Sequence, residues 1–402
     1  MVHFSPAPAA DIAANLKSLC SRDEWDRIEV LNLDAWVRRF LEKQSFVLKL
    51  AYDEGENLWQ KALAMLPPEL ALTSDFVRSE WNNVVQAQGV DDLSGYLRVS
   101  RVGRTRRLSR TERQQLWSVF GEYRALLNEQ GLCEPADAFR TAVGLIRDRG
   151  ITFPYQAVVV DEAQDFGNEA FRLLRALVPA GANDLFIVGD AHQRIYGHQV
   201  VLSRCDIDIR GRGKKLRINY RTTEEVKNWA IGLLKGYSFD DLDAGVDDTD
   251  AVRSIVNGEP PVVKACSGVT EAADLVCSHI TQLLQGESAP PETICLVART
   301  HYELEAYEKY VRQVCPTIHQ IEPGKADDGT KPGIRLATIH RVKGLEFDHM
   351  IIAGALDDFD TPSSDSTEKI TANRALLYVA ATRARKSLLV CRIIKKAIKE
   401  SP

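Results

Sequence analysis

Short apolar runs alternate with helix-like stretches through most of the chain after Gln156. The stretch "NEAFRLLRALV" has the spacing of an amphipathic helix, and the runs that read as buried strands are "AVVV", "DLFIVGD", "TICLVAR", "GIRLATIH", "HMIIAGAL" and "SLLVCRII". Strands that alternate with helices form parallel sheets whose faces the helices cover. The pattern therefore predicts an α/β protein with parallel sheets.

A helical region precedes this pattern. From Phe40 to Leu145 strand signals are few, and "TERQQLWSVFGEYRALLNEQ" repeats apolar residues every three or four positions, at Leu116, Val119, Phe120, Tyr123 and Leu126. We therefore expect a helical insertion over residues 42–145. It would interrupt a first α/β domain of residues 1–41 and 146–208, and a second α/β domain would cover residues 209–402.

Composition narrows the class of protein. A chain of 402 residues with 45% hydrophobic content has room for two or three domains, and its net charge of −5 excludes a uniformly basic nucleic-acid binder. The eight cysteines form no C-x-x-C pair, which favours a reducing compartment, expected to be the cytoplasm. Neither a signal peptide nor a run of about 18 apolar residues is present, so we expect no secretion and no membrane insertion.

Two carboxylates follow the first buried run, in "AVVVDEAQDF". A strand of a parallel sheet would deliver Asp161 and Glu162 to the carboxyl edge, where α/β folds bind ligands. One carboxylate could hold Mg²⁺ while its neighbour deprotonates an attacking water, as phosphoryl transfer requires. A lone acidic pair could equally be a polar helix cap, so the pair by itself does not decide.

Four more segments of the same kind follow in order. Each sets polar side chains beside a strand or a helix, as in "LFIVGDAHQRIYG", "LRINYRTTEEV", "IRLATIHRVKGLEFDHMII" and "NRALLYVAATRARKSLLV". The ordered set, from Val158 to Arg385, resembles the superfamily 1 helicases of the UvrD, Rep and PcrA group, whose signatures are "DExxD", "GDxxQxIYG", "NYRS", "TxHxxKGLEF" and "YVAxTRA". The resemblance implies two RecA-like parallel-sheet domains, the first incomplete, with a helical 1B-type insertion.

The resemblance also implies a site for ATP and Mg²⁺ between the two domains. Asp161 would bind Mg²⁺, Glu162 would be the general base, and Gln193 would sense the γ-phosphate. The remaining roles belong to residues of the second domain: Arg221 and Arg383 as phosphate-binding cations, Tyr220 as the platform for adenine, and Glu346 as the acceptor for the ribose hydroxyls.

Nucleic-acid contacts are implied at other positions. By resemblance, Thr338 and His340 would lie near the phosphate backbone and Tyr196 would stack on a base. His198 stands where the family usually has tryptophan, and we expect it to contact DNA by stacking or by bonding a phosphate. The run "RVSRVGRTRRLSRTER" holds seven arginines and reads as a polyanion site, with Arg104, Arg106 and Arg107 at its centre. The alternative for this run is a solvated, charged surface.

One family element is missing from the sequence. No glycine-rich Walker A loop ends in Lys-Ser or Lys-Thr, since the Gly-Lys dipeptides at Gly213 and Gly324 lack the required neighbours. The resemblance implies that the chain starts near the motif that follows this loop, so we expect it to be deficient in ATP hydrolysis alone. The interval from Thr300 to Ile334 is too short for the family's 2B subdomain, which we expect to be absent or vestigial.

The leading hypothesis is an ATP-dependent DNA helicase or translocase of the UvrD type, moving 3′ to 5′ on single-stranded or partly duplex DNA. The runner-up is a non-catalytic nucleic-acid-binding or scaffolding protein with the same fold. The enzyme is favoured because four expected catalytic residues are present: Glu162, Gln193, Arg221 and Arg383. In a chain that had lost catalysis, sequence drift would be expected to replace them. An ATPase that acts on RNA or on a protein stays open, because phosphate contacts do not read the sugar.

Overall fold

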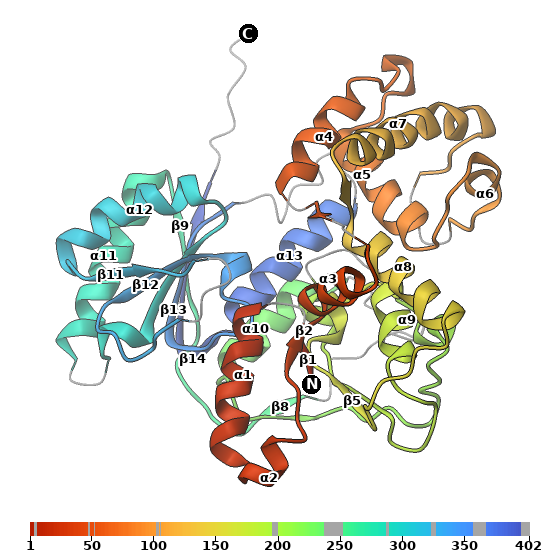
Figure 1. Cartoon of the computed structure of the whole chain (residues 1–402). Coiled ribbons are helices and arrows are strands. Elements are labelled where there is room, and N and C mark those ends of the chain that lie inside the picture. Colours follow the sequence, from red (N-terminus) through yellow and green to blue (C-terminus); the bar gives the residue numbers. More distant parts are fainter. Residues whose placement is uncertain are drawn as a thin grey trace. The chain divides into compact units, whose positions relative to one another are not determined.

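The computed structural model describes residues 1–3, 6–46, 49–51, 53–101, 104, 106–194, 200–236, 252–286, 289–322, 327–356 and 367–394. The chain divides into two compact units, and the boundary between them falls after Gly213. Figure 1 shows helices packed around sheets in both units, and each described strand pair is parallel. The predicted α/β class with parallel sheets is confirmed.

The first unit is built on a four-stranded sheet with the order β2-β1-β5-β6. Its strands are β1 (Val2–His3), β2 (Leu31–Asn32), β5 (Val158–Val160) and β6 (Leu185–Ile187). Helices α1 (Pro6–Leu19) and α2 (Arg22–Trp25) connect β1 with β2. Val2 pairs with both Leu31 and Val160, so β1 joins the amino-terminal part of the sheet to β5.

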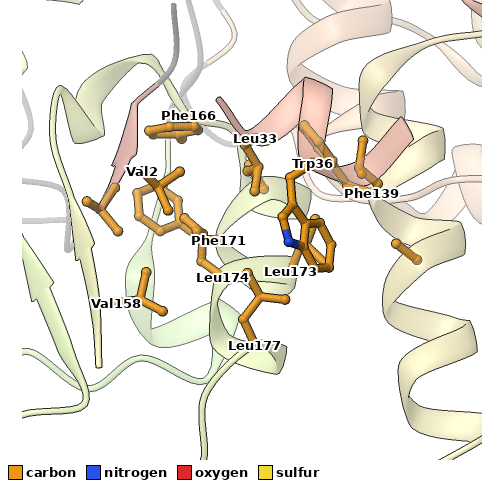
Figure 2. Close-up of a cluster of buried hydrophobic side chains, with 14 of the residues drawn as sticks. Val2, Leu33, Trp36, Phe139, Val158, Phe166, Phe171, Leu173, Leu174 and Leu177 are labelled. Carbon is orange, nitrogen blue, oxygen red and sulfur yellow. The ribbon is translucent and has the colours of Figure 1, made fainter. Parts of the chain in front are cut away.

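Three helices supply the core against this sheet: α3 (Leu33–Lys43), α8 (Pro135–Asp148) and α9 (Asn168–Ala176). Helix α3 starts where the Asn32 side chain accepts a hydrogen bond from the Ala35 amide at 3.0 Å. Figure 2 shows Trp36 and Phe139 from two of these helices among the buried side chains, with Phe171 from α9. This packing fixes β5, and with it the position of the residues that follow Val160.

The region between α3 and α8 is mostly helical and has a core of its own. Its elements are β3 (Lys49–Leu50), α4 (Asp53–Leu63), η1 (Pro68–Leu70), α5 (Ser74–Glu80), the π-helix η2 (Trp81–Gln86), α6 (Leu93–Arg98), α7 (Arg110–Glu129) and β4 (Leu132–Cys133). Trp59 stacks on Tyr123 with ring centroids 4.1 Å apart, and Trp81 meets Tyr123 edge-on. The helix predicted from apolar spacing is confirmed as α7, which buries Leu116, Val119, Phe120 and Tyr123.

The second unit contains a six-stranded sheet with the order β11-β12-β10-β13-β14-β9. Its strands are β9 (Val262–Cys266), β10 (Ile294–Ala298), β11 (Ile318–Gln320), β12 (Ile334–Thr338), β13 (Phe347–Leu356) and β14 (Ala384–Ile393). Four helices cover it: α10 (Glu224–Leu234), α11 (Val269–Gln285), α12 (His301–Val314) and α13 (Thr367–Ala381). A separate pair, β7 (Ile218–Asn219) and β8 (Arg253–Ser254), lies beside α10.

Both faces of the larger sheet are buried. Within β10, Cys295 and Val297 belong to the cluster with α10 and α13, whereas Ile294, Leu296 and Ala298 belong to the cluster with α11 and α12. This alternation places helices on both faces, as parallel sheets require. In the described part of the chain, no helix combines the length and the apolar content needed to cross a bilayer.

The predicted strands at "AVVV", "DLFIVGD", "TICLVAR", "GIRLATIH", "HMIIAGAL" and "SLLVCRII" are confirmed as β5, β6, β10, β12, β13 and β14. One boundary differs: the segment "NRALLYVAATRARKSLLV" predicts a helix that extends through Thr382 and Arg383 before the final strand. Helix α13 ends at Ala381, and both residues lie in the turn that leads into β14.

A half-buried carboxylate just before α8 bonds to side chains of the helical region. The carboxylate of Glu134 accepts hydrogen bonds from Trp81 Nε1 at 2.9 Å and Tyr123 Oη at 3.0 Å, and another from the Gln86 amide. Burial and the nearby Asp137 carboxylate nevertheless raise the pKa of Glu134 above its ordinary value of 4.5. A raised folded-state pKa means that the folded protein holds this proton more tightly than the unfolded chain does.

We expect Glu134→Gln to change how stability depends on pH. As pH rises from about 4.5 through the folded-state pKa, the wild-type protein loses roughly 1.4 kcal/mol for each unit by which that pKa is raised. The variant has no carboxyl group at this position, so it should gain stability relative to wild type over the same window. Urea unfolding at a series of pH values measures the difference, and the exposed Glu129→Gln is the control. Parallel pH profiles for all three proteins would contradict the expectation.

Candidate active site

The end of β5 turns sharply at the two predicted carboxylates. Asp161 Oδ1 accepts a hydrogen bond from the Glu162 amide at 2.9 Å, and Glu162 has left-handed backbone angles, with φ 51° and ψ 44°. A residue with a side chain seldom adopts this conformation, so the surrounding contacts must hold it there. One such contact is the hydrogen bond that Gln164 Nε2 donates to Glu162 Oε2.

Gln164 also connects the ends of two neighbouring strands. Its side chain is 1% exposed, and its Oε1 accepts a hydrogen bond from the amide of Asp190, just beyond β6, at 2.9 Å. The backbone makes the same connection, because the Ala163 amide donates to the Val188 carbonyl at 2.9 Å. The Asp-Glu pair after β5 and the polar residues after β6 therefore form one cluster.

Gly189 allows this close approach. A Cβ added there would lie 2.7 Å from Gln164 Oε1 and 2.9 Å from the Cβ of Ala163. Real Cβ atoms essentially never come this near to other heavy atoms, so a larger residue would push the two strand ends apart.

Asp190 organises the turn after β6. Its carboxylate accepts hydrogen bonds from the His192 amide and Nδ1, each at 3.0 Å, and from Gln193 Nε2 at 2.9 Å. Burial favours the neutral acid, but the bonds from His192 and Gln193 outweigh it and hold the pKa of Asp190 below its ordinary value. Asp190 is therefore charged at neutral pH, and it positions Gln193.

The donor atoms of this cluster are of the kind that Mg²⁺ prefers. Asp161 and Glu162 offer carboxylate oxygens, but among the described residues no three His, Cys, Asp or Glu side chains converge as a complete metal site. Mg²⁺ commonly binds to one or two carboxylates and takes its remaining ligands from phosphates and water. The cluster fits a magnesium ion that arrives with a nucleotide better than a structural metal.

In the second unit, Asn219 shapes the turn before α10. Its Oδ1 accepts hydrogen bonds from the amides of Arg221 at 2.8 Å and Thr222 at 3.3 Å. Tyr220 is left exposed, and Arg221 Nε forms an ion pair with Glu346 Oε1. The structure thus brings together Arg221 and Glu346, two of the residues predicted to bind nucleotide.

Arg383 is placed differently. Its side chain is 1% exposed, Nε donates to the Val379 carbonyl at 3.1 Å, and Nη2 donates to Thr382 Oγ1 at 3.3 Å. Thr338 is the last residue of β12, and His340 follows in the short helix η7 (Ile339–Arg341). Tyr196 and His198 lie outside the described residues.

The arginine-rich run makes internal contacts in the helical region. Glu80 is fully buried, and its carboxylate bonds to Arg101 Nε at 2.5 Å, to Arg104 Nε at 3.2 Å and to the hydroxyl of Tyr96 at 3.0 Å. Arg106 Nη2 donates to the Leu70 carbonyl at 3.0 Å. Of the three arginines predicted at the centre of a polyanion site, Arg107 is exposed, whereas Arg104 and Arg106 are half-buried.

Comparison with known protein families identifies two matching domains in this chain. Residues 2–201 match the UvrD/REP helicase N-terminal domain, and residues 311–395 match the UvrD-like helicase C-terminal domain. Both matches are to domains of UvrD-like helicases, and the match to the N-terminal domain precedes the match to the C-terminal domain along the chain. The chain therefore belongs to the UvrD-like helicase family.

Individual relatives are distant and longer. The chain is 24% identical over 244 residues to a Mycoplasma pneumoniae protein named "Probable DNA helicase", a match that covers 58% of this chain and 42% of that protein. It is 21% identical over 268 residues to "Putative ATP-dependent DNA helicase R568" of Acanthamoeba polyphaga mimivirus, covering 58% and 34%. The chain thus spans less than half the length of either relative.

A similar solved structure is the C-terminal domain of a possible DNA helicase from Lactobacillus plantarum WCFS1. It is 18% identical, with a TM-score of 0.32, and the match covers 44% of this chain and 88% of that one.

Gln164 is the site residue that sequence reasoning missed. The signal was present in "DEAQD", where an amide stands two residues after the second carboxylate. Its bond to Asp190 joins residues 26 positions apart, so only the pairing of β5 with β6 makes its role visible.

Gly189→Ala should separate the two strand ends. The added methyl group meets Gln164 and Ala163, so we expect the free energy of unfolding to fall by about 1 to 3 kcal/mol. Gly181→Ala is the matched control, because a Cβ there meets no heavy atom within 4 Å, and its effect should stay within about 0.5 kcal/mol. Chemical denaturation of both variants tests this, and equal effects would refute the steric account.

Proposed function

We propose that this chain carries catalytic parts of an ATP-dependent DNA helicase or translocase that moves 3′ to 5′ on single-stranded DNA. The observation that carries the proposal is the cluster formed by Asp161, Glu162, Gln164 and Gln193 after β5 and β6. Carboxylates and amides at the carboxyl edge of a parallel sheet suit hydrolysis of a bound phosphate ester. Membership in the UvrD-like helicase family supports ATP as the nucleotide.

In this proposal the first unit handles the metal and the attacking water. Asp161 would hold Mg²⁺, which neutralises charge on the phosphates when it is bound. Glu162 would accept the proton of the attacking water, and Gln164 would keep the Glu162 carboxylate oriented through its hydrogen bond. Gln193, bonded to Asp190, would contact the γ-phosphate and report its loss to the neighbouring strand.

Residues of the second unit would complete nucleotide binding. Tyr220 would stack on adenine, Glu346 would accept hydrogen bonds from the ribose, and Arg221 would contact phosphate. These assignments are supported by the exposure of Tyr220 and by the proximity of Arg221 to Glu346. Arg383 would be a second phosphate contact, and because it is buried, that role requires the guanidinium to leave its bonds with Val379 and Thr382.

For nucleic acid, we propose contacts at the carboxyl end of β12 from Thr338 and His340, together with Tyr196 and His198. Arg107 is the member of the arginine-rich run best exposed for a phosphate, whereas Arg104 and Arg106 hold the helical region together. DNA is preferred over RNA because both curated relatives are named as DNA helicases.

The sequence contains no glycine-rich loop that ends in Lys-Ser or Lys-Thr. Backbone amides of such a loop normally hold the β- and γ-phosphates. We therefore propose that the described residues supply the metal-binding, basic and sensing groups, and that turnover by this chain alone is slow.

Glu162→Gln tests the proposal directly. The amide cannot accept a proton, so DNA-stimulated ATP hydrolysis should fall by at least about 100-fold relative to wild type. Glu129→Gln removes an exposed carboxylate elsewhere and should leave the rate unchanged. A rate that survives Glu162→Gln would sink the assignment of the base. No turnover in either protein, with single-stranded DNA still bound, would mean that the missing phosphate loop must be restored before the base can be tested.

A further inference from the structure

An exposed strip of cations and apolar side chains runs along β7 and β8 in the second unit. The segment from Lys214 to Tyr220 reads "KKLRINY", and all of its residues except Asn219 are exposed. Leu216 is 85% exposed, Ile218 53% and Tyr220 70%, and Ile255 beside β8 is 62% exposed. Scattered exposed apolar residues are ordinary, but here one lies in β7 and three flank the two paired strands.

The backbone holds this strip in a fixed form. Ile218 pairs with Arg253 and Asn219 pairs with Ser254, and the Arg253 amide donates to the Arg217 carbonyl at 2.8 Å. Residues that pair in parallel strands project to the same side of the sheet, so Ile218 and Arg253 share a face. An apolar side chain and a cation therefore stand side by side.

The opposite side of the pair is fastened to α10. The Ser254 amide donates to Glu224 Oε2 at 2.6 Å, and the Glu224 amide donates to the Val256 carbonyl at 2.8 Å. Asn219 is turned toward its own loop by its bonds to Arg221 and Thr222. The strip is thus a supported segment whose side chains remain exposed.

The charge of the strip has one sign. Lys214, Arg217 and Arg253 form no ion pair with any carboxylate in the described ranges. The acidic side chains at the start of α10, Glu224 and Glu225, bond to Lys227 and to backbone amides. Positive charge beside apolar side chains on an exposed surface fits a polyanion that also presents flat apolar faces.

We propose that this strip, defined as Lys214, Leu216, Arg217, Ile218, Arg253 and Ile255, binds single-stranded DNA. Proteins that bind single strands combine cations for the phosphates with apolar and aromatic side chains for the base faces. The strip offers this combination on residues other than Thr338 and His340, so it adds further contacts to the proposed function. The inference rests on the proposed function for one point, the choice of single-stranded DNA as the ligand. It does not require that the chain hydrolyses ATP.

Removing the cations tests the inference. The full-length variant Lys214→Ala/Arg217→Ala/Arg253→Ala is titrated against fluorescent oligo(dT) without nucleotide, and binding is followed by anisotropy at several salt concentrations. We expect affinity at low salt to fall at least about 10-fold. The slope of log K against log salt should shrink by about 2, because each lost phosphate contact removes roughly 0.7.

The control variant Lys17→Ala/Lys61→Ala/Lys309→Ala removes the same charge from exposed positions elsewhere. It should keep the wild-type affinity and slope. The six aspartates between residues 240 and 250 are a competing anion within the chain itself. If these aspartates occupied the strip, removing its cations would not weaken binding to oligo(dT). The two triple variants would then bind oligo(dT) equally well, and that outcome overturns the inference.

Ile218→Ser/Ile255→Ser tests the apolar part. Both side chains are exposed, so the fold should persist, which thermal unfolding checks. Affinity for oligo(dT) should fall several-fold while the salt slope stays at the wild-type value. Unchanged affinity in this variant would also overturn the inference. Tyr220 is left intact in every variant because the proposed function assigns it to adenine. The titrations contain no nucleotide, so they measure DNA binding even if the chain hydrolyses no ATP.

Discussion

The side chain of Gln164 ties together the two strand ends on which the candidate site is built. Its amide nitrogen donates to Glu162 and its amide oxygen accepts from Asp190, so both ends of one buried group are satisfied at once. Glu162 stays in a left-handed conformation because this bond and the Asp161 cap act on it together. Gly189 has no side chain, so it leaves room for the Gln164 side chain and for Ala163. A change at any of these positions therefore disturbs the carboxylates and the polar turn after β6 together.

Charge alone did not reveal what the arginine-rich run does. Seven arginines in a short segment read as a polyanion site, yet Arg101 and Arg104 share the buried carboxylate of Glu80. Buried cations without that carboxylate would be costly, so Glu80 and the arginines form one structural unit. In the second unit, Lys214, Arg217 and Arg253 are exposed and form no ion pair with a carboxylate of the described residues. Exposure and pairing, rather than the density of basic residues, separate structural arginines from those that remain available for a polyanion.

The sequence predicted the buried strands well, because parallel strands covered on both faces appear as continuous apolar runs. Short or exposed strands gave weaker signals. Four of the five residues of β9 are exposed and lysine interrupts it, and β1 and β2 are two residues long, so none was predicted. Within the site, local spacing identified Asp161 and Glu162 after β5. The contacts of Gln164 with Asp190 and of Arg221 with Glu346 depend on residues far apart in sequence, which spacing cannot show.

Under the proposed function, Arg221 and Glu346 would hold different parts of one nucleotide, although here they bind each other. Their side chains are 46% and 35% exposed, and an ion pair this open contributes about 0 to 1 kcal/mol. Exchanging it for phosphate and ribose therefore costs little, and the pair keeps both groups close to their working positions. Arg383 differs, because its bonds are buried and must be broken without help from water. Nucleotide binding would then begin at Arg221, and engagement of Arg383 would require a rearrangement of the turn between α13 and β14.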